Sequence, residues 1–186
     1  MASKINVDEI NSRTGSGTLT IGASGDTVTL GSGASFSNVS GQNYPAFVAY
    51  LSSDQSLTHN VTTKVTFDTE IFDTDNCYDN STNYRFTPTV AGKYFIYSAA
   101  IVYGTGDLES GKILYYKNGT VIRQSHLDPA NSSNAINQAS VVLNAVVDMN
   151  GSSDYIEIFT NVQSGVGALI NSGTQGTYFG AYRIGA

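Results

Sequence analysis

The stretch from Phe67 to Tyr103, which reads FDTEIFDTDNCYDNSTNYRFTPTVAGKYFIYSAAIVY, decides the fold of this chain. In its last part, Lys93 to Tyr103, residues of both parities are apolar or aromatic. A strand with one face in water alternates apolar with polar residues, so this pattern predicts a strand that is covered on both faces. The second cover is either another subunit, which is a first indication of an oligomer, or the second layer of a monomeric sandwich.

The aromatic and turn residues of this stretch follow a family spacing. Five residues separate Phe67 from Asp73, four separate Asp73 from Tyr78, and five separate Phe86 from Gly92-Lys93-Tyr94. In this spacing the chain resembles the C1q/tumour-necrosis-factor-like jelly roll, a compact trimeric domain. The interval from Tyr78 to Phe86 is one residue longer than in the family pattern. The resemblance covers residues 45 to 186 and implies an all-β, C1q-like jelly-roll sandwich, a fold that serves many unrelated ligands.

Residues 1–41 differ in composition from the rest and are predicted to form an N-terminal anchoring arm or β stalk, ahead of a jelly-roll knob at 42–186. Two units, Thr18 to Gly22 and Thr27 to Gly31, alternate Thr with aliphatic residues and end in Gly. Such short strands do not form a core alone, so they require a partner. We expect three chains to wind them into a stalk, and the alternative is a flexible leader. The residues predicted to pack in the trimer or stalk are Leu19, Ile21, Val28, Leu30, Tyr94 and Ile96.

The remaining pattern is that of short strands joined by polar turns. Asn118 and Gly119 predict a type I′ hairpin turn, which needs positive φ at both positions. Polar loops at 104–110 and 127–137 are expected to be exposed tips. In 138–148 the odd-numbered residues are apolar, which predicts one core-facing side. Strands are expected at 46–51, 63–72, 83–87, 93–103, 112–117, 120–126, 138–148, 154–161 and 177–184.

Composition limits the classes of function. Charged residues are only 13% of the 186 residues and the net charge is −6, which argues against a nucleic-acid partner. The single cysteine, Cys77, excludes an internal disulfide framework and is expected to be a small buried residue. Neither a signal peptide nor a segment of membrane-spanning length is present in the sequence. The composition is that of a surface protein, and the sequence predicts synthesis in a cytoplasm. These two traits together are typical of proteins of virus particles that are assembled inside a host.

No catalytic constellation, cofactor site or metal site is predicted. Asp73, Asp75 and Asp79 form an oxygen-rich cluster, but a solvated loop is expected in preference to a Ca²⁺ site because the Ca²⁺-loop spacing is missing. His59 and His126 lack companions at zinc-ligand spacing. Adjacent residues of a strand point to opposite faces, so the run Ser125 to Asp128 is not a triad. The carboxylate pairs available for glycosidase chemistry are Asp107 with Glu109 and Asp154 with Glu157.

Together these observations predict a non-enzymatic structural protein of a bacteriophage particle. We expect a homotrimeric surface protein of the virion, either a capsid decoration (cement) protein or a short tail fibre or appendage. Its partners are other virion proteins through the N-terminal arm, and a host-surface glycan or protein through the knob, without nucleic acid or membrane insertion. The alternatives are a lectin-like module that binds carbohydrate or protein, and a small tailspike-type enzyme that degrades glycans.

Overall fold

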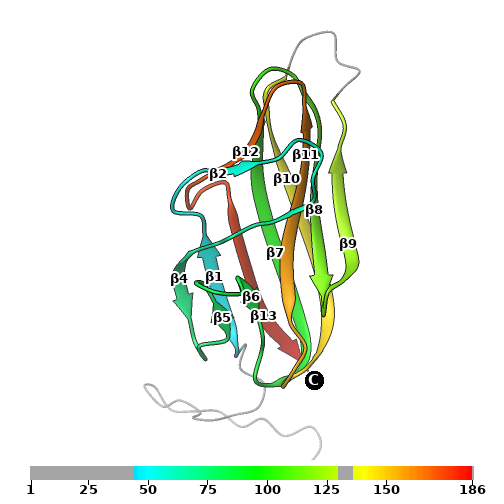
Figure 1. Ribbon diagram of the computed structural model, residues 1–186. Coiled ribbons are helices and arrows are strands. Elements are labelled where there is room, and N and C mark those ends of the chain that lie inside the picture. The colour runs from blue at the N-terminus through cyan, green and yellow to red at the C-terminus, as the bar shows by residue number, and fades with distance from the viewer. Residues whose placement is uncertain (1–43, 130–135, 186) are drawn as a thin grey trace, which may run out of the picture. The chain divides into compact units, whose positions relative to one another are not determined.

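The computed structural model describes residues 44–129 and 136–185, which form two antiparallel sheets packed face to face (Figure 1). The larger, seven-stranded sheet has the order β2-β12-β7-β13-β1-β4, with β10 also paired to β7. We call it the β7 sheet. Its strands are β1 (Ala46–Tyr50), β2 (Gln55–Leu57), β4 (Thr69–Asp73), β7 (Ala91–Gly104), β10 (Gln138–Asn150), β12 (Ala168–Asn171) and β13 (Tyr178–Gly185).

The second sheet has six strands in the order β5-β6-β11-β8-β9, with β3 paired to β11. We call it the β11 sheet. Each strand of this sheet pairs antiparallel with its neighbours, as in the first sheet. Its strands are β3 (Thr63–Lys64), β5 (Tyr78–Asp79), β6 (Arg85–Phe86), β8 (Leu108–Lys117), β9 (Thr120–Leu127) and β11 (Ile156–Ser164).

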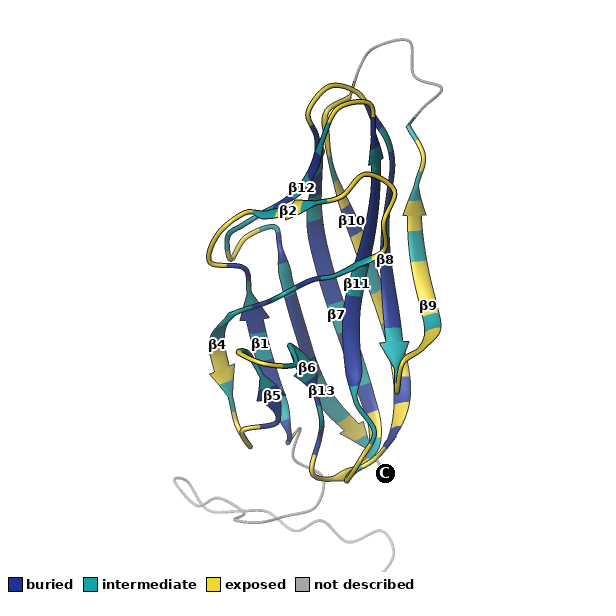
Figure 2. Cartoon of the chain, in the orientation of Figure 1, coloured by how far each residue is buried: buried dark blue, intermediate teal, exposed yellow. Residues whose placement is uncertain are grey.

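The core lies between the two sheets, and the stretch that decides the fold supplies its centre. The Phe47 ring stacks on Tyr78, with centroids 4.6 Å apart, and on Phe86, with centroids 4.8 Å apart. Phe67 and Phe179 contact each other in the same cluster. The buried interior runs along β7, β13, β8 and β11 in Figure 2. Burial of this much apolar surface is the main force that stabilises the sandwich.

Two predicted features of the strands are confirmed in detail. The odd-numbered residues of β10 face the core, with Val141 and Val147 buried. Asn118 and Gly119 have φ angles of 51° and 78° in the β8–β9 hairpin. The Asn118 side chain also accepts a hydrogen bond from the backbone N–H of Tyr155, so this turn is tied to the β10–β11 turn.

The expected strand 63–72 is wrong, because the chain changes sheets within it. Thr63–Lys64 is β3 of the β11 sheet and Thr69–Asp73 is β4 of the β7 sheet. Between them Val65 and Phe67 turn into the core. Strands β2, β5 and β12 were not predicted, since segments of two to four residues leave no readable alternation.

Candidate functional site

The outer face of the β7 sheet carries a cluster of half-buried aromatic side chains. Phe95 and Tyr97 alternate along β7 with core residues, and Tyr178 and Tyr182 do the same on the neighbouring β13. Ring centroids are 5.5 Å apart for Phe95 and Tyr182, 6.2 Å for Tyr97 and Tyr178, and 6.3 Å for Tyr97 and Tyr182. Burial, with the neighbouring hydroxyls of Tyr182 and Tyr178, raises the pKa of Tyr97. The four rings therefore form one continuous apolar surface.

Aliphatic residues of the neighbouring strands extend this surface. Val142 lies opposite Ala99 and Val146 opposite Phe95 in the β10–β7 pairing, and the two valines are 53% and 51% exposed. On the other side, Phe72 of β4 is 45% exposed opposite Val48. Apolar residues that are exposed side by side on a folded domain indicate an interaction site. We call the surface formed by Phe95, Tyr97, Tyr178, Tyr182, Val142 and Val146 the aromatic face.

The aromatic face corrects the choice of packing residues made from the sequence. Tyr94 and Ile96 are completely buried in the core of their own chain, so their side chains are not available to a second copy. The opposite parity of β7, with Phe95 and Tyr97, points outward instead. Leu19, Ile21, Val28 and Leu30, and the expected boundary between residues 41 and 42, lie outside the described residues.

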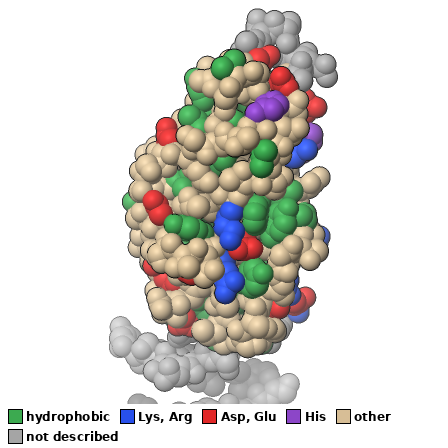
Figure 3. All heavy atoms as spheres, in the orientation of Figure 1, with side chains coloured by type: hydrophobic (Ala, Val, Ile, Leu, Met, Phe, Trp, Pro, Cys, Tyr) green, Lys and Arg blue, Asp and Glu red, His purple; other side chains and the backbone are tan. Residues whose placement is uncertain are grey.

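The outer face of the β11 sheet has a different character. Tyr116 of β8 and Phe159 of β11 lie in contact, with ring centroids 4.2 Å apart. Lys64 Nζ is 5.8 Å from the centroid of the Phe159 ring and 2.5 Å from Glu157 Oε1. Figure 3 shows hydrophobic, basic and acidic side chains side by side on this face of the molecule. This group is not predicted from the sequence, although Tyr155, Glu157 and Phe159 alternate there with apolar residues.

In the acidic segment Asp73 to Asp79, at the end of β4 and after it, carboxylates accept hydrogen bonds from groups of their own turns. Asp73 Oδ2 accepts a hydrogen bond from the backbone N–H of Tyr78 at 2.7 Å, and Asp73 Oδ1 accepts from the Cys77 thiol at 3.2 Å. Asp79 accepts hydrogen bonds from the backbone N–H groups of Ser81, Thr82 and Asn83. The hydrogen bond from Thr82 is the main cause of the lowered pKa of Asp79. Within residues 44–129 and 136–185 no group of three or more His, Cys, Asp or Glu side chains is arranged to hold a metal ion.

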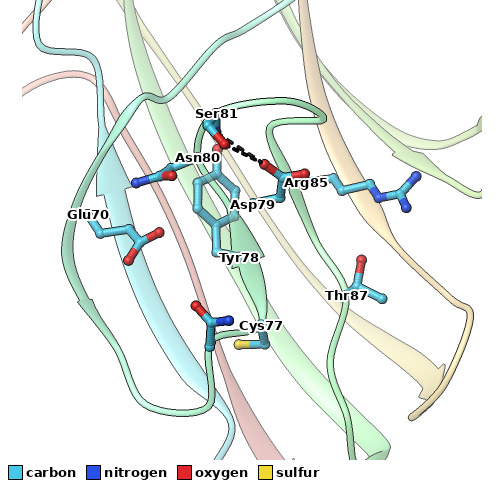
Figure 4. A pocket seen from close by; sticks show the side chains of 9 residues that line it. Glu70, Cys77, Tyr78, Asp79, Asn80, Ser81, Arg85 and Thr87 are labelled. Atoms are coloured by element: carbon cyan, nitrogen blue, oxygen red, sulfur yellow. Dashed lines mark hydrogen bonds between the residues drawn. The ribbon is translucent and has the colours of Figure 1, made fainter.

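An open pocket of about 440 Å³ lies beside this segment (Figure 4). Glu70, Asn80 and Arg85 are among its lining residues, and burial raises the pKa of the Glu70 carboxyl. Cys77 also lines it but is 4% exposed, as expected, and burial strongly raises the pKa of its thiol. A thiol held in its neutral form is a poor nucleophile, so Cys77 is a packing residue.

The structure brings one predicted carboxylate pair together. Asp107 and Glu109 line a pocket of about 490 Å³ with His126 and Asp128. Glu109 Oε2 accepts a hydrogen bond from Gln163 Nε2 at 2.5 Å, and Asp107 Oδ1 accepts one from the backbone N–H of Ile136 at 3.2 Å. Each of the two carboxylates therefore accepts a hydrogen bond from a neighbouring segment.

The second pair is divided between two structural contacts. Asp154 accepts hydrogen bonds from Lys117 and Asn118, whereas Glu157 pairs with Lys64.

Ser125 lies opposite the core residue Ile113 and His126 opposite Lys112, so the two side chains face opposite sides of β9, as expected. His59 Nδ1 accepts the backbone N–H of Ser164 at 3.2 Å.

Comparison with solved structures fixes the fold. Murine APRIL at pH 5.0 is similar with a TM-score of 0.57 and 12% sequence identity, over 75% of this chain and 98% of that chain. The fold is a TNF-like jelly roll. Eiger TNF from S. frugiperda is similar with a TM-score of 0.57 and 9% identity, over 78% of this chain and 96% of that chain. No family model and no curated protein sequence matches the chain. None of the described residues forms a helix long and apolar enough to cross a membrane.

Proposed function

We propose that this protein is a non-enzymatic, homotrimeric surface protein whose copies pack through the aromatic face. The observation that carries the proposal is the half-buried aromatic cluster on the outer side of the β7 sheet, with Val142 and Val146 more than half exposed beside it. Aromatic side chains contribute strongly to interfaces because each buries a large rigid area. A second copy on this face removes that area from water.

We expect a closed ring of three copies rather than a two-fold dimer. The trimeric state is what the resemblance to C1q and tumour-necrosis-factor domains implies, and the TNF-like fold supports the same expectation. A heterologous contact that closes by rotation forms a ring without unpaired surfaces. The aromatic face lies on the β7 sheet only, and it shares no residue with the outer face of the β11 sheet.

For the biological setting, we infer a structural role on a bacteriophage particle, as a capsid decoration protein or a short fibre or appendage. The Gly-punctuated units at Thr18 to Gly22 and Thr27 to Gly31 support this role, since they resemble the leaders of phage virion proteins. The N-terminal arm then anchors the protein to other virion proteins and the knob faces outward. Detection of the chain by mass spectrometry in purified phage particles tests this role, and its absence from all particle fractions would contradict it.

The native mass tests the assembly. Light scattering on a sizing column is expected to give about three times 19.7 kDa, with and without chelator. Val146→Glu places a charge on the aromatic face and is expected to yield monomers. Val121→Glu is the matched control, because Val121 is 43% exposed on β9 of the other sheet, and this variant should remain a trimer. A monomeric wild type would contradict the proposal, and a trimer that dissociates in chelator would show that a metal ion contributes to the assembly.

A further inference from the structure

We infer that the outer face of the β11 sheet binds a neutral saccharide on the ring pair of Tyr116 and Phe159. We call this site the ring platform, formed by Tyr116, Phe159, Glu157, Lys64 and Arg85. The inference names a ligand class for the outer face of the second sheet. It does not require the trimer, because none of these residues belongs to the aromatic face.

The register of the strands puts these five residues on a compact grid. Glu157 of β11 lies opposite Tyr116 of β8 on one side and opposite Arg85 of β6 on the other. Phe159, two residues further along β11, lies opposite Lys64 of β3. With neighbouring strands about 4.8 Å apart and a rise of about 3.3 Å per residue, the grid measures roughly 10 Å by roughly 7 Å.

That size indicates the kind of ligand. A stable protein interface buries about 800 Å² on each partner, which is many times the area of the grid. The grid instead matches the footprint of one or two sugar rings. The C–H face of a pyranose is apolar and weakly positive, so it packs on the negative face of an aromatic ring. The half-buried rings of Tyr116 and Phe159 have centroids 4.2 Å apart and planes inclined at 40°, and Lys64 Nζ lies 5.8 Å from the Phe159 centroid, so Tyr116 is the ring on which we expect the sugar to pack.

The polar groups around the rings are fixed in position. The Arg85 guanidinium carbon lies 4.4 Å from the centroid of the Tyr155 ring, and within the part of the chain that the structure describes its side chain takes part in no ion pair or hydrogen bond. Lys64 Nζ is held between Glu157 Oε1 and the backbone oxygen of Asn83. A guanidinium held by stacking, with its donors free, is prepared to bond to a ligand oxygen.

Charge at the platform favours a neutral ligand over an acidic one. Two cations, Lys64 and Arg85, are matched by the carboxylates of Glu157 and of Asp79, which lies opposite Arg85 in the β5–β6 pairing. Glu157 is itself buried and bound to Lys64, so Arg85 is the group that donates to a sugar hydroxyl, which accepts without adding charge. A ligand carboxylate would gain from Arg85 but would be repelled by both acids.

An array of neutral and carboxylated oligosaccharides, probed with the full-length protein, tests the inference. We expect binding to neutral glycans, with at least a tenfold loss for Tyr116→Ala and for Phe159→Ala. Tyr116→Phe keeps the ring and should retain binding. Tyr44→Ala is the matched aromatic control, since Tyr44 is 50% exposed ahead of β1 and outside the platform, and this variant should bind as the wild type does.

Salt dependence separates neutral recognition from charge pairing. Binding to a neutral glycan should change less than twofold between about 50 mM and about 500 mM NaCl, whereas charge pairing weakens with screening. The inference is overturned by failure to bind any neutral glycan, by selective binding of carboxylated ones, or by binding that survives Tyr116→Ala. Light scattering on the same samples reports assembly separately, so a monomer that still binds through the platform contradicts the proposed trimer alone.

Discussion

The ring of Tyr97 lies directly against the backbone of Gly180 on the neighbouring strand. A Cβ added at Gly180 would lie 2.5 Å from both Cζ and the hydroxyl oxygen of Tyr97, closer than any normal contact. The missing side chain at Gly180 therefore leaves room for the Tyr97 ring over β13, with its centroid 6.2 Å from that of Tyr178 and 6.3 Å from that of Tyr182. This close approach shapes the centre of the aromatic face.

The first prediction follows from this contact. Gly180→Ala should force the Tyr97 ring outward and weaken the trimer at least tenfold, since small-to-large changes at a packed contact disrupt its geometry. The folded monomer should lose little, because the ring is half-buried and has solvent to move into. Sedimentation at several concentrations measures the effect. Gly165→Ala is the matched control, as nothing lies within 4 Å of an added Cβ there. An unchanged trimer in Gly180→Ala would remove Tyr97 from the interface.

The sequence predicted this face only in part, and the reason is geometric. The two-faced pattern of Lys93 to Tyr103 correctly indicated that both sides of β7 are apolar, but it carries no information on which parity meets the second sheet. That choice depends on the pairing of Tyr94 with Arg183 and of Phe95 with Tyr182, contacts made across more than 80 residues. The tertiary pairing therefore determines which side of β7 faces the second sheet, and it places Tyr94 and Ile96 in the core.

The ring platform was harder still to predict from the sequence. Its members come from four strands, and two of these, β3 and β6, have only two residues each. Lys64 and Arg85 reach Phe159 and Tyr155 only because the chain changes sheets after β3 and returns through β5 and β6. By contrast, the Asn118 and Gly119 turn was readable because its conformation depends on two adjacent residues.

A second prediction concerns a buried polar contact between the sheets. The Tyr115 hydroxyl, on the β11 sheet, lies 2.9 Å from Ser98 Oγ of β7 and donates to the backbone oxygen of Leu143. Tyr115→Phe removes both of these hydrogen bonds and should lower the free energy of unfolding by about 1–3 kcal/mol. Urea unfolding measures this loss. The double variant with Ser98→Ala should recover part of it, and a loss that is strictly additive would show that the two hydroxyls do not interact.

A third prediction addresses the turn between β5 and β6. Asp79 accepts hydrogen bonds from three successive backbone N–H groups, those of Ser81, Thr82 and Asn83. Asp79→Ala should therefore lower the free energy of unfolding by about 1–2 kcal/mol, as loss of a capping side chain does. Asp75→Ala, whose carboxylate is exposed and lies 3.4 Å from Thr89 Oγ1, should change it by less than about 0.5 kcal/mol. Equal effects in the two variants would contradict a specific role for Asp79.

The last prediction is that the stability of the fold decreases at acidic pH. The hydrogen bond from Lys117, with that from Asn118, lowers the pKa of Asp154 below its ordinary value of 3.8. The folded protein then binds a proton at Asp154 less readily than the unfolded chain, so stability is present above that value and is lost as the pH falls below it. Chemical unfolding between about pH 6 and about pH 2 should show this decline, and Asp154→Asn should make it shallower.

The control for the acid prediction is Asp148→Asn. Asp148 is a carboxylate of the same type, but its side chain is 79% exposed and pairs with Lys93 at 3.2 Å at the surface. Exposed ion pairs contribute little, so this variant should keep the acid slope of the wild type. Two hairpin turns meet at Asp154, since it also accepts the backbone N–H of Asn150 at 3.0 Å, and protonation there loosens both turns together. An Asp154→Asn variant with the wild-type slope would place the acid-sensitive group elsewhere, with Asp79 the next carboxylate to replace.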